Sequence, residues 1–201
     1  MSNISLLEFI RYVFSGAILY ICLYIFYPEY VGLIAEKAGV IGFPIIMAVI
    51  GILIYFLYRP LIYDPLIERL QYKFNPFGKN YRQELTQRYK INFEQATRLF
   101  ILIRDNYLKD KYHNLKMQSA GIHMMYQASI IFSVVGLIVY LNEKDSKSIV
   151  LMIVSLIIFI GAYLQDSKYE ILERDMLLSL GWDKIDEIAF NIGYKKRDTK
   201  S

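Results

Sequence analysis

Few side chains in this chain could carry chemistry, and their spacing builds no reaction centre. The two histidines, His113 and His123, lie ten positions apart. On an α-helix this spacing turns them about 80° from a common face and separates them by about 15 Å, so they cannot ligate one metal ion. The single cysteine, Cys22, cannot form a disulfide within the chain. The sequence has no phosphate-binding glycine loop, zinc-binding helix or serine elbow, so we expect no enzyme activity, no cofactor and no metal.

Polar and small residues recur at steps of three and four in the stretch 117–142. They are Ser119, His123, Tyr126, Ser129, Ser133, Gly136 and Tyr140, and we name them the polar seam. This spacing places the seam on one face of a helix, which either meets other helices or lines a wet path. We favour helix contact, with His123 bonded to a neighbouring helix. Because the seam is longer than one four-helix bundle needs, we also expect a homo-oligomer, with a tetramer as the expected closed assembly.

Basic residues repeat beside two tyrosines in the stretch 81–98. They are Arg82, Arg88, Lys90 and Arg98, next to Tyr81 and Tyr89. Anionic head groups could attract them by about 1 kcal/mol per residue. A helix lying on lipid also needs an apolar face, and over residues 81–91 only Leu85 and Ile91 supply one. We therefore expect the four basic residues to form a surface that binds an acidic cytosolic protein.

The composition demands a large apolar surface that is buried or covered by lipid. Of the 201 residues, 55% are hydrophobic and 21% are charged, with a mean hydropathy of +0.30, which excludes a disordered chain. Asp, Glu, Lys and Arg are absent from four windows, at residues 12–28, 38–58, 117–142 and 148–165. A helix needs about 20 apolar residues to cross a bilayer. The windows predict an all-α fold, a four-helix integral membrane protein in contact with membrane lipids.

The distribution of basic residues predicts the orientation of the spans. Segment 59–116 holds 12 Lys and Arg against 6 Asp and Glu, whereas the connections 29–37 and 143–147 are nearly neutral. We expect both termini in the cytoplasm and spans at about 9–28, 38–58, 120–142 and 148–165. The first span ends without a small-residue cleavage site and is expected to be a retained anchor. The expected parts are a transmembrane hairpin (1–58), a cytoplasmic helical segment (59–116), a second hairpin (117–165) and a cytoplasmic helical tail (166–201).

Local signals predict several details of these helices. The pair Asp64-Pro65 has the pattern of a helix start, and Asn92 with Gln95 has that of a capping box. Pro44 predicts a kink in the second span. Small residues of the second and fourth spans, Gly51 and Ser155 among them, are expected to face the polar seam. A tail helix is expected to dock on the central helices through a stripe of Ile185, Ile188, Ala189 and Ile192.

A nucleic-acid partner is not expected. Residues 180–193 resemble the start of a helix-turn-helix, but only 8 residues follow Gly193, too few for the second helix that would read DNA.

In layout, the chain resembles the small four-pass membrane components of bacterial anti-phage defence systems, such as the Kiwa membrane component and the membrane accessory proteins of some CRISPR systems. The resemblance covers the whole chain in outline, through four spans, inward termini and the basic segment 59–116, and it assigns no residue roles. It implies a homo-oligomer that docks a cytosolic partner at the inner membrane. We thus expect a non-catalytic scaffold or sensor, with an oligomeric channel or membrane-perturbing effector as the alternative.

Overall fold

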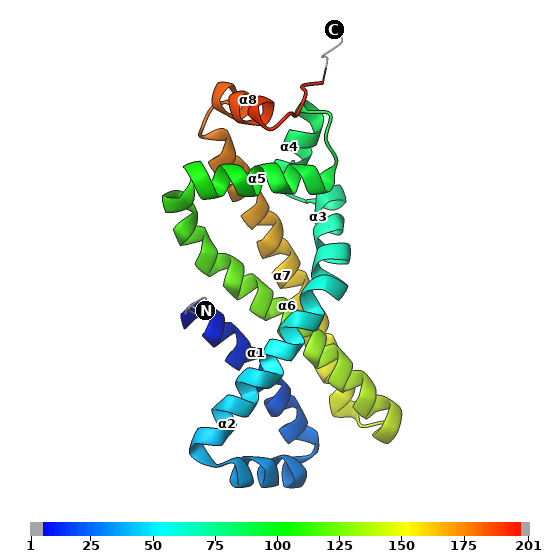
Figure 1. Cartoon of the computed structure of the whole chain (residues 1–201). Coiled ribbons are helices and arrows are strands. Elements are labelled where there is room, and N and C mark those ends of the chain that lie inside the picture. Colours follow the sequence, from blue (N-terminus) through cyan, green and yellow to red (C-terminus); the bar gives the residue numbers. More distant parts are fainter. Residues whose placement is uncertain (1–5, 198–201) are drawn as a thin grey trace. The chain divides into compact units, whose positions relative to one another are not determined.

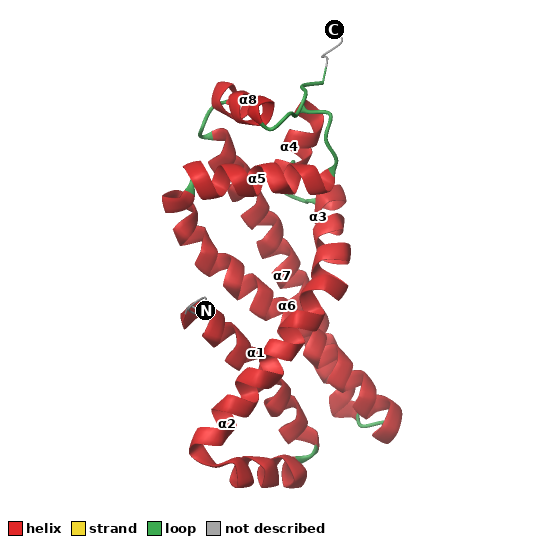
Figure 2. Cartoon of the chain, in the orientation of Figure 1, coloured by secondary structure: helices red, strands yellow, loops and turns green. Residues whose placement is uncertain are grey.

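The computed structural model describes residues 6–197, apart from the side chains of residues 6–9, 11, 113 and 114. The prediction for His113 therefore lies outside the described side chains. The described part is all-α, which confirms the predicted class, and Figure 2 shows helices joined by short loops. The helices are α1 (Leu6–Phe26), α2 (Pro28–Tyr58), the π-helix η1 (Arg59–Ile67), α3 (Glu68–Phe74), α4 (Tyr81–Arg88), α5 (Phe93–Tyr107), α6 (Lys109–Glu143), α7 (Ser146–Leu178) and α8 (Trp182–Asn191).

The chain divides into two compact units. The first, which we name the apolar unit, contains the described residues up to Ile67 together with Ala120–Tyr163. The second, the charged unit, contains Glu68–Ser119 and the described residues from Leu164 onward. The predicted limits at residues 58, 117 and 165 lie near these divisions. The long helices α6 and α7 each contribute to both units.

Three helices of the described part are long and apolar enough to cross a membrane. They cover Pro28–Phe74, Leu115–Glu143 and Ser146–Leu178. The stretch Tyr12–Phe26 in α1 forms a shorter apolar helix. The four charge-free windows of the sequence thus correspond to three long apolar helices and one shorter one.

Two glycines allow α1 and α2 to cross at backbone contact in the apolar unit (Figure 1). A methyl group added at Gly16 would overlap the carbonyl oxygen of Met47, and one added at Gly51 would overlap that of Tyr12. Glycine at such a crossing lets two helix backbones approach closely. The prediction that Gly51 faces the polar seam is therefore wrong, because its open side is taken by α1.

The irregular point of α2 is Gly39, where φ is 67° and ψ is −179°. The sequence predicted a kink at Pro44, which lies within the helical part of α2 instead. A positive φ is easy for glycine and strained for other residues, so the chain bends where no Cβ opposes it.

The sequence signal at Asp64-Pro65 does not start a helix. Both residues lie inside η1, whose wider turns connect α2 directly to α3. A proline within an α-helix removes one backbone donor and collides with the preceding turn, and a π-helical stretch is one way to accommodate it. The prediction of a new helix at this point is therefore wrong.

The core of the charged unit joins α4, α5, α7 and α8. Its buried centre includes Leu99, Phe100 and Ile103 of α5, Leu177 of α7 and Ile185 of α8. The docking of the tail helix is thereby confirmed for Ile185, Ile188 and Ala189, whereas Ile192 is exposed. The capping box of Asn92 and Gln95 is also confirmed. A second box, formed by Asn80 and Gln83, opens α4 and had not been predicted.

Candidate functional site

A buried ionic cluster lies at the centre of the charged unit. Arg82 of α4, only 4% exposed, donates from Nη1 to Glu170 of α7 and from Nη2 to Glu68 of α3, the latter at 3.1 Å. Its Nε donates to Thr97 Oγ1 at 3.0 Å. Asn80 Nδ2 donates to the second oxygen of Glu170 at 2.7 Å. One guanidinium thus joins α3, α4, α5 and α7.

A further carboxyl group, Glu173, faces this cluster from the next turn of α7. Glu173 is buried. It interacts electrostatically with four residues that affect its pKa, and its charge affects the pKa of two tyrosines. The four residues are Arg82, Tyr169, Glu170 and Asp166, and the tyrosines are Tyr81 and Tyr112. Burial raises the pKa of Glu173 from 4.5 to about 8, and the neighbouring Glu170 and Asp166 add to the rise while Arg82 opposes it. These residues follow the charge-free window 148–165 and lie outside the apolar part of α7. Burial therefore favours the protonated form of Glu173 in the folded protein.

The burial of Arg82 corrects the predicted basic surface. The sequence placed Arg82 with Arg88, Lys90 and Arg98 on one exposed face, but α4 turns Arg82 inward together with Leu85 and Thr86. The physical reason is the acidic side of α7, which needs a cation once it is buried. Lys90 and Arg98 are exposed, and Arg88 is half-buried.

A sequence signal for this cluster existed in α7. Glu173 lies four residues after Tyr169 and four before Leu177, inside the apolar stripe that docks this helix. An acid on a buried face requires a partner or a raised pKa. No role for Glu173 was predicted from the sequence.

The half-buried Arg88 closes a second ionic contact, between α4 and α8. Its Nε and Nη2 donate to the two carboxylate oxygens of Asp186 at 2.9 and 2.6 Å. Tyr89 donates its hydroxyl to Asp186 at 2.6 Å, and Lys196 Nζ lies 2.5 Å from the same carboxylate. The hydrogen bond from Arg88 is the main reason why the pKa of Asp186 lies below its usual range. The guanidinium also stacks on Trp182, 4.2 Å from the ring centroid.

The tail after α8 is fixed against the loop that follows α4. Lys90 N donates to Lys195 O at 2.9 Å, and Arg197 N donates to Arg88 O at 2.8 Å. Tyr89 and Lys196 form an isolated β-bridge, and Arg197 Nε donates to Tyr89 O at 3.0 Å. These bonds gather four exposed basic residues, which we name the basic corner: Lys90, Lys195, Lys196 and Arg197.

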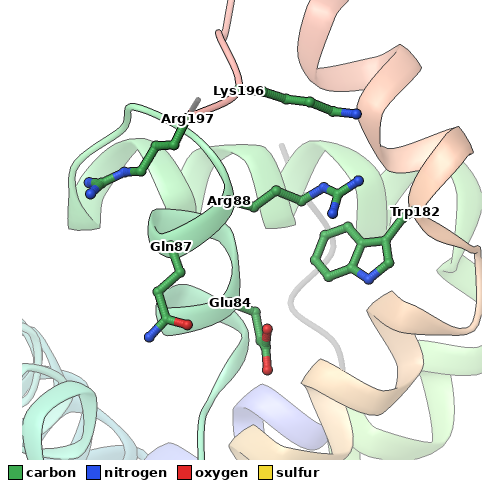
Figure 3. A pocket seen from close by; sticks show the side chains of 6 residues that line it. All are labelled: Glu84, Gln87, Arg88, Trp182, Lys196 and Arg197. Atoms are coloured by element: carbon green, nitrogen blue, oxygen red, sulfur yellow. The ribbon is translucent and has the colours of Figure 1, made fainter. Parts of the chain in front are cut away.

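Two open grooves lie beside the basic corner. One, of about 490 Å³, is lined by Glu84, Gln87, Arg88, Trp182, Lys196 and Arg197, and Figure 3 shows Arg88 beside the indole ring with Lys196 reaching over them. The other, of about 550 Å³, is lined by basic, acidic and aromatic residues: Lys195 and Lys196, Asp183, Asp186 and Glu187, and Tyr89, Phe190 and Tyr194. Phe190 is 79% exposed, although its neighbours Ile188 and Ala189 are buried. The corner therefore combines positive charge with an uncovered aromatic ring.

The polar seam of α6 finds partners within the chain. His123 Nδ1 lies 3.2 Å from the Tyr58 hydroxyl. Ser129 Oγ donates to Ser155 O at 3.0 Å, and the hydroxyls of Ser133 and Ser155 lie 2.5 Å apart. Contact between helices, which the sequence favoured over a wet path, accounts for these three seam residues.

The other seam residues divide between packing and exposure. Tyr126 is buried against the rings of Tyr63 and Phe159, and a Cβ at Gly136 would lie 2.9 Å from Met152 Cγ. Tyr140 is exposed, and Ser119 is half-buried in the charged unit. The sequence argument for an oligomer assumed spare seam positions, and five of the seven are used inside one chain. The homo-oligomer thus stays a prediction without support from the seam.

The sequence reading missed one polar contact in the apolar unit. Gln127 of α6 is fully buried and accepts a hydrogen bond from Ser15 of α1. Gln127 lies one position off the seam, so the periodic pattern did not include it.

Among the described residues, no group of three or more His, Cys, Asp or Glu side chains is placed to hold a metal ion. Comparison of the chain with protein-family models, with curated proteins and with solved structures finds no match.

Proposed function

We propose that this chain is a four-pass protein of the cytoplasmic membrane whose charged unit docks an acidic cytosolic protein at the basic corner. The uncovered Phe190 ring beside the basic corner carries this proposal. The basic corner and the Phe190 ring together suit a partner segment with Asp or Glu residues around one apolar side chain. The basic residues attract the acidic side chains of such a segment, and the ring packs against its apolar side chain. The protein acts as a scaffold or sensor in this proposal, and a place in phage defence stays a prediction.

The part of α7 that follows the charge-free window belongs to the charged unit. The charge-free window ends at Gln165, and α7 continues for thirteen residues to Leu178 before α8 begins. At 1.5 Å per residue, this stretch extends about 20 Å along the helix axis. In the proposed topology, this stretch lies on the cytoplasmic side of the membrane.

The four-span topology rests on the charge-free windows and on the basic segment 59–116. Reporter fusions active only in the cytoplasm should be active at Asn75 and after Ser201, and silent at Glu36 and Asp145. An inactive fusion after Ser201, with an active one at Asn75, would overturn the four-span count.

Photo-crosslinking in living cells tests the docking proposal. The crosslinker p-benzoylphenylalanine is placed at Phe190, with Phe77 as a matched exposed aromatic site away from the corner. We expect Phe190 alone to give a discrete protein adduct whose crosslinked peptide is rich in Asp or Glu. The double variant Lys90→Glu with Lys195→Glu should abolish the adduct while the membrane fraction keeps its full amount of protein. A lipid adduct, an adduct between two copies of this chain, or an adduct that survives charge reversal would each refute the proposal.

The channel alternative has no observation in its favour within one chain. Ser129 and Ser133, which would have lined a wet path, are bonded to Ser155 of α7.

A further inference from the structure

The first part of α2 is a separate short helix, which we name the elbow helix (28–38). Tyr27 before it is non-helical, with φ −131° and ψ 57°, and Pro28 starts the helix. Gly39 after it, with φ 67° and ψ −179°, separates it from the rest of α2. Figure 1 shows the elbow helix running across the direction of the two longer segments that it joins in the apolar unit. The sequence had treated these residues only as a short connection between two spans.

The elbow helix has three distinct faces. Val31 is buried, with Ala35 and Ala38 half-buried on the same side. A second face exposes large apolar side chains, Tyr30 at 72%, Leu33 and Ile34. At 100° per residue, the charged pair Glu29 and Glu36 lies about 100° around the helix from the centre of that apolar face. One face thus packs on the protein, one is uncovered and apolar except for Lys37, and one carries the two glutamates.

Further exposed apolar side chains follow the elbow helix along the chain. Val40 is 93% exposed and Ile41 is also uncovered, directly after the bend at Gly39. Val49, farther along α2, is exposed as well. Lys37 lies at the apolar face, and its long stem allows the ammonium group to reach water while the methylenes stay against lipid. An apolar surface of this extent in water would be unfavourable, whereas a lipid boundary covers it.

We infer that the elbow helix lies in the membrane–water interface, with Tyr30, Leu33 and Ile34 inserted among the lipid chains and with Glu29 and Glu36 in water. This inference rests on the proposed membrane topology and adds an in-plane segment to it. Interfacial helices have this division into an apolar and a charged face. Tyrosine at the boundary is favoured because its ring is apolar and its hydroxyl prefers water.

Quenching of tryptophan by brominated phospholipids tests the depth of the elbow helix. The full-length protein carries Trp182→Phe, which removes the only native tryptophan, and one new tryptophan at a time: Leu33→Trp, Glu36→Trp or Val49→Trp. Each variant is reconstituted in vesicles of phosphatidylcholine brominated either near the head group or near the chain ends. We expect Leu33→Trp to be quenched at least twofold more by the shallow bromines, and Glu36→Trp to be quenched by neither.

The Val49→Trp variant separates the two proposals. Strong quenching by the deep bromines at this site supports the transmembrane α2, and its absence would contradict the membrane topology itself. With Val49→Trp quenched, an unquenched Leu33→Trp would show that water or protein covers the elbow helix. A Leu33→Trp quenched best by deep bromines would place the helix inside the bilayer. Either result overturns the interfacial position.

Discussion

Arg82 and Glu170 form an ion pair between α4 and α7 in which both side chains are almost completely shielded from solvent. The two residues are 88 positions apart in the sequence. A buried pair of this kind contributes little when compared with a well-packed apolar pair, but the loss of one partner leaves the other charge uncompensated. The pair therefore makes the fold of the charged unit depend on both helices being present together.

Replacement of Arg82 should destabilise the charged unit strongly. Arg82→Met leaves the buried Glu170 and the half-buried Glu68 without their cation, and we expect the free energy of unfolding to fall by about 3–5 kcal/mol. Urea unfolding in mild detergent, followed by Trp182 fluorescence, measures this loss in the charged unit because Trp182 is the single tryptophan.

Two variants control the experiment on Arg82. The exposed Arg98→Met should change the free energy of unfolding by less than about 0.5 kcal/mol. The double variant Arg82→Met with Glu170→Met should recover part of the loss, since it removes both charges. A loss for Arg82→Met no larger than that for Arg98→Met would contradict the buried pair.

The stability of the charged unit should fall as the pH rises between about 4.5 and about 8. Burial raises the pKa of Glu173 from 4.5 to about 8, so in this interval the folded protein holds a proton that the unfolded chain has lost. Stability then decreases as the pH rises. The contribution of Glu173 to the stability is complete below pH 4.5 and is lost above pH 8. Glu173→Gln should make the curve of unfolding free energy against pH less steep, measured by Trp182 fluorescence. The remaining slope has the same sign, because burial also raises the pKa of Glu170.

Asp186 also makes the stability of the charged unit depend on pH, but with the opposite sign and at lower pH. Its pKa in the folded protein is lowered, chiefly by the hydrogen bond from Arg88, so its stabilisation is present at neutral pH and is lost only in strong acid. The two effects are thus separable. A curve for Glu173→Gln as steep as that of the unchanged protein between pH 4.5 and 8 would rule out the assignment to Glu173.

The crossing of α1 and α2 should not tolerate a side chain at Gly51. Gly51→Ala places a methyl group on the Tyr12 carbonyl, and the helices must separate, which we expect to cost about 1–3 kcal/mol. Gly121→Ala is the matched control, because no atom lies within 4 Å of the added methyl group. Thermal unfolding in detergent should show a lower midpoint for Gly51→Ala alone. Equal midpoints for the two variants would contradict the backbone contact.

The sequence predicted the structural features that depend on neighbouring residues. It did not predict the contacts that depend on packing between helices far apart in the chain. Charge-free windows gave the long helices, and the capping box at Asn92 needed only Gln95, three positions away. The orientation of Arg82 depends on Glu170, which no local pattern links to it. Gly51 was recognised as a contact site, but its partner on α1 is determined by the way the helices cross. Periodicity finds a face of a helix, and packing determines what that face meets.

Cysteines in the polar seam should be protected from water. In a Cys22→Ala background, Ser129→Cys and Ser133→Cys should not react with membrane-impermeant maleimide, because Ser129 is buried against Ser155 and the exposed Ser133 lies in a proposed span, where lipid or detergent covers it. Arg98→Cys, an exposed site of the charged unit, gives the reference rate in detergent-solubilised protein. An unchanged thermal midpoint shows that each variant is folded. Labelling of Ser129→Cys and Ser133→Cys at the Arg98→Cys rate in folded protein would reveal a wet path along α6 and would support the channel over the scaffold.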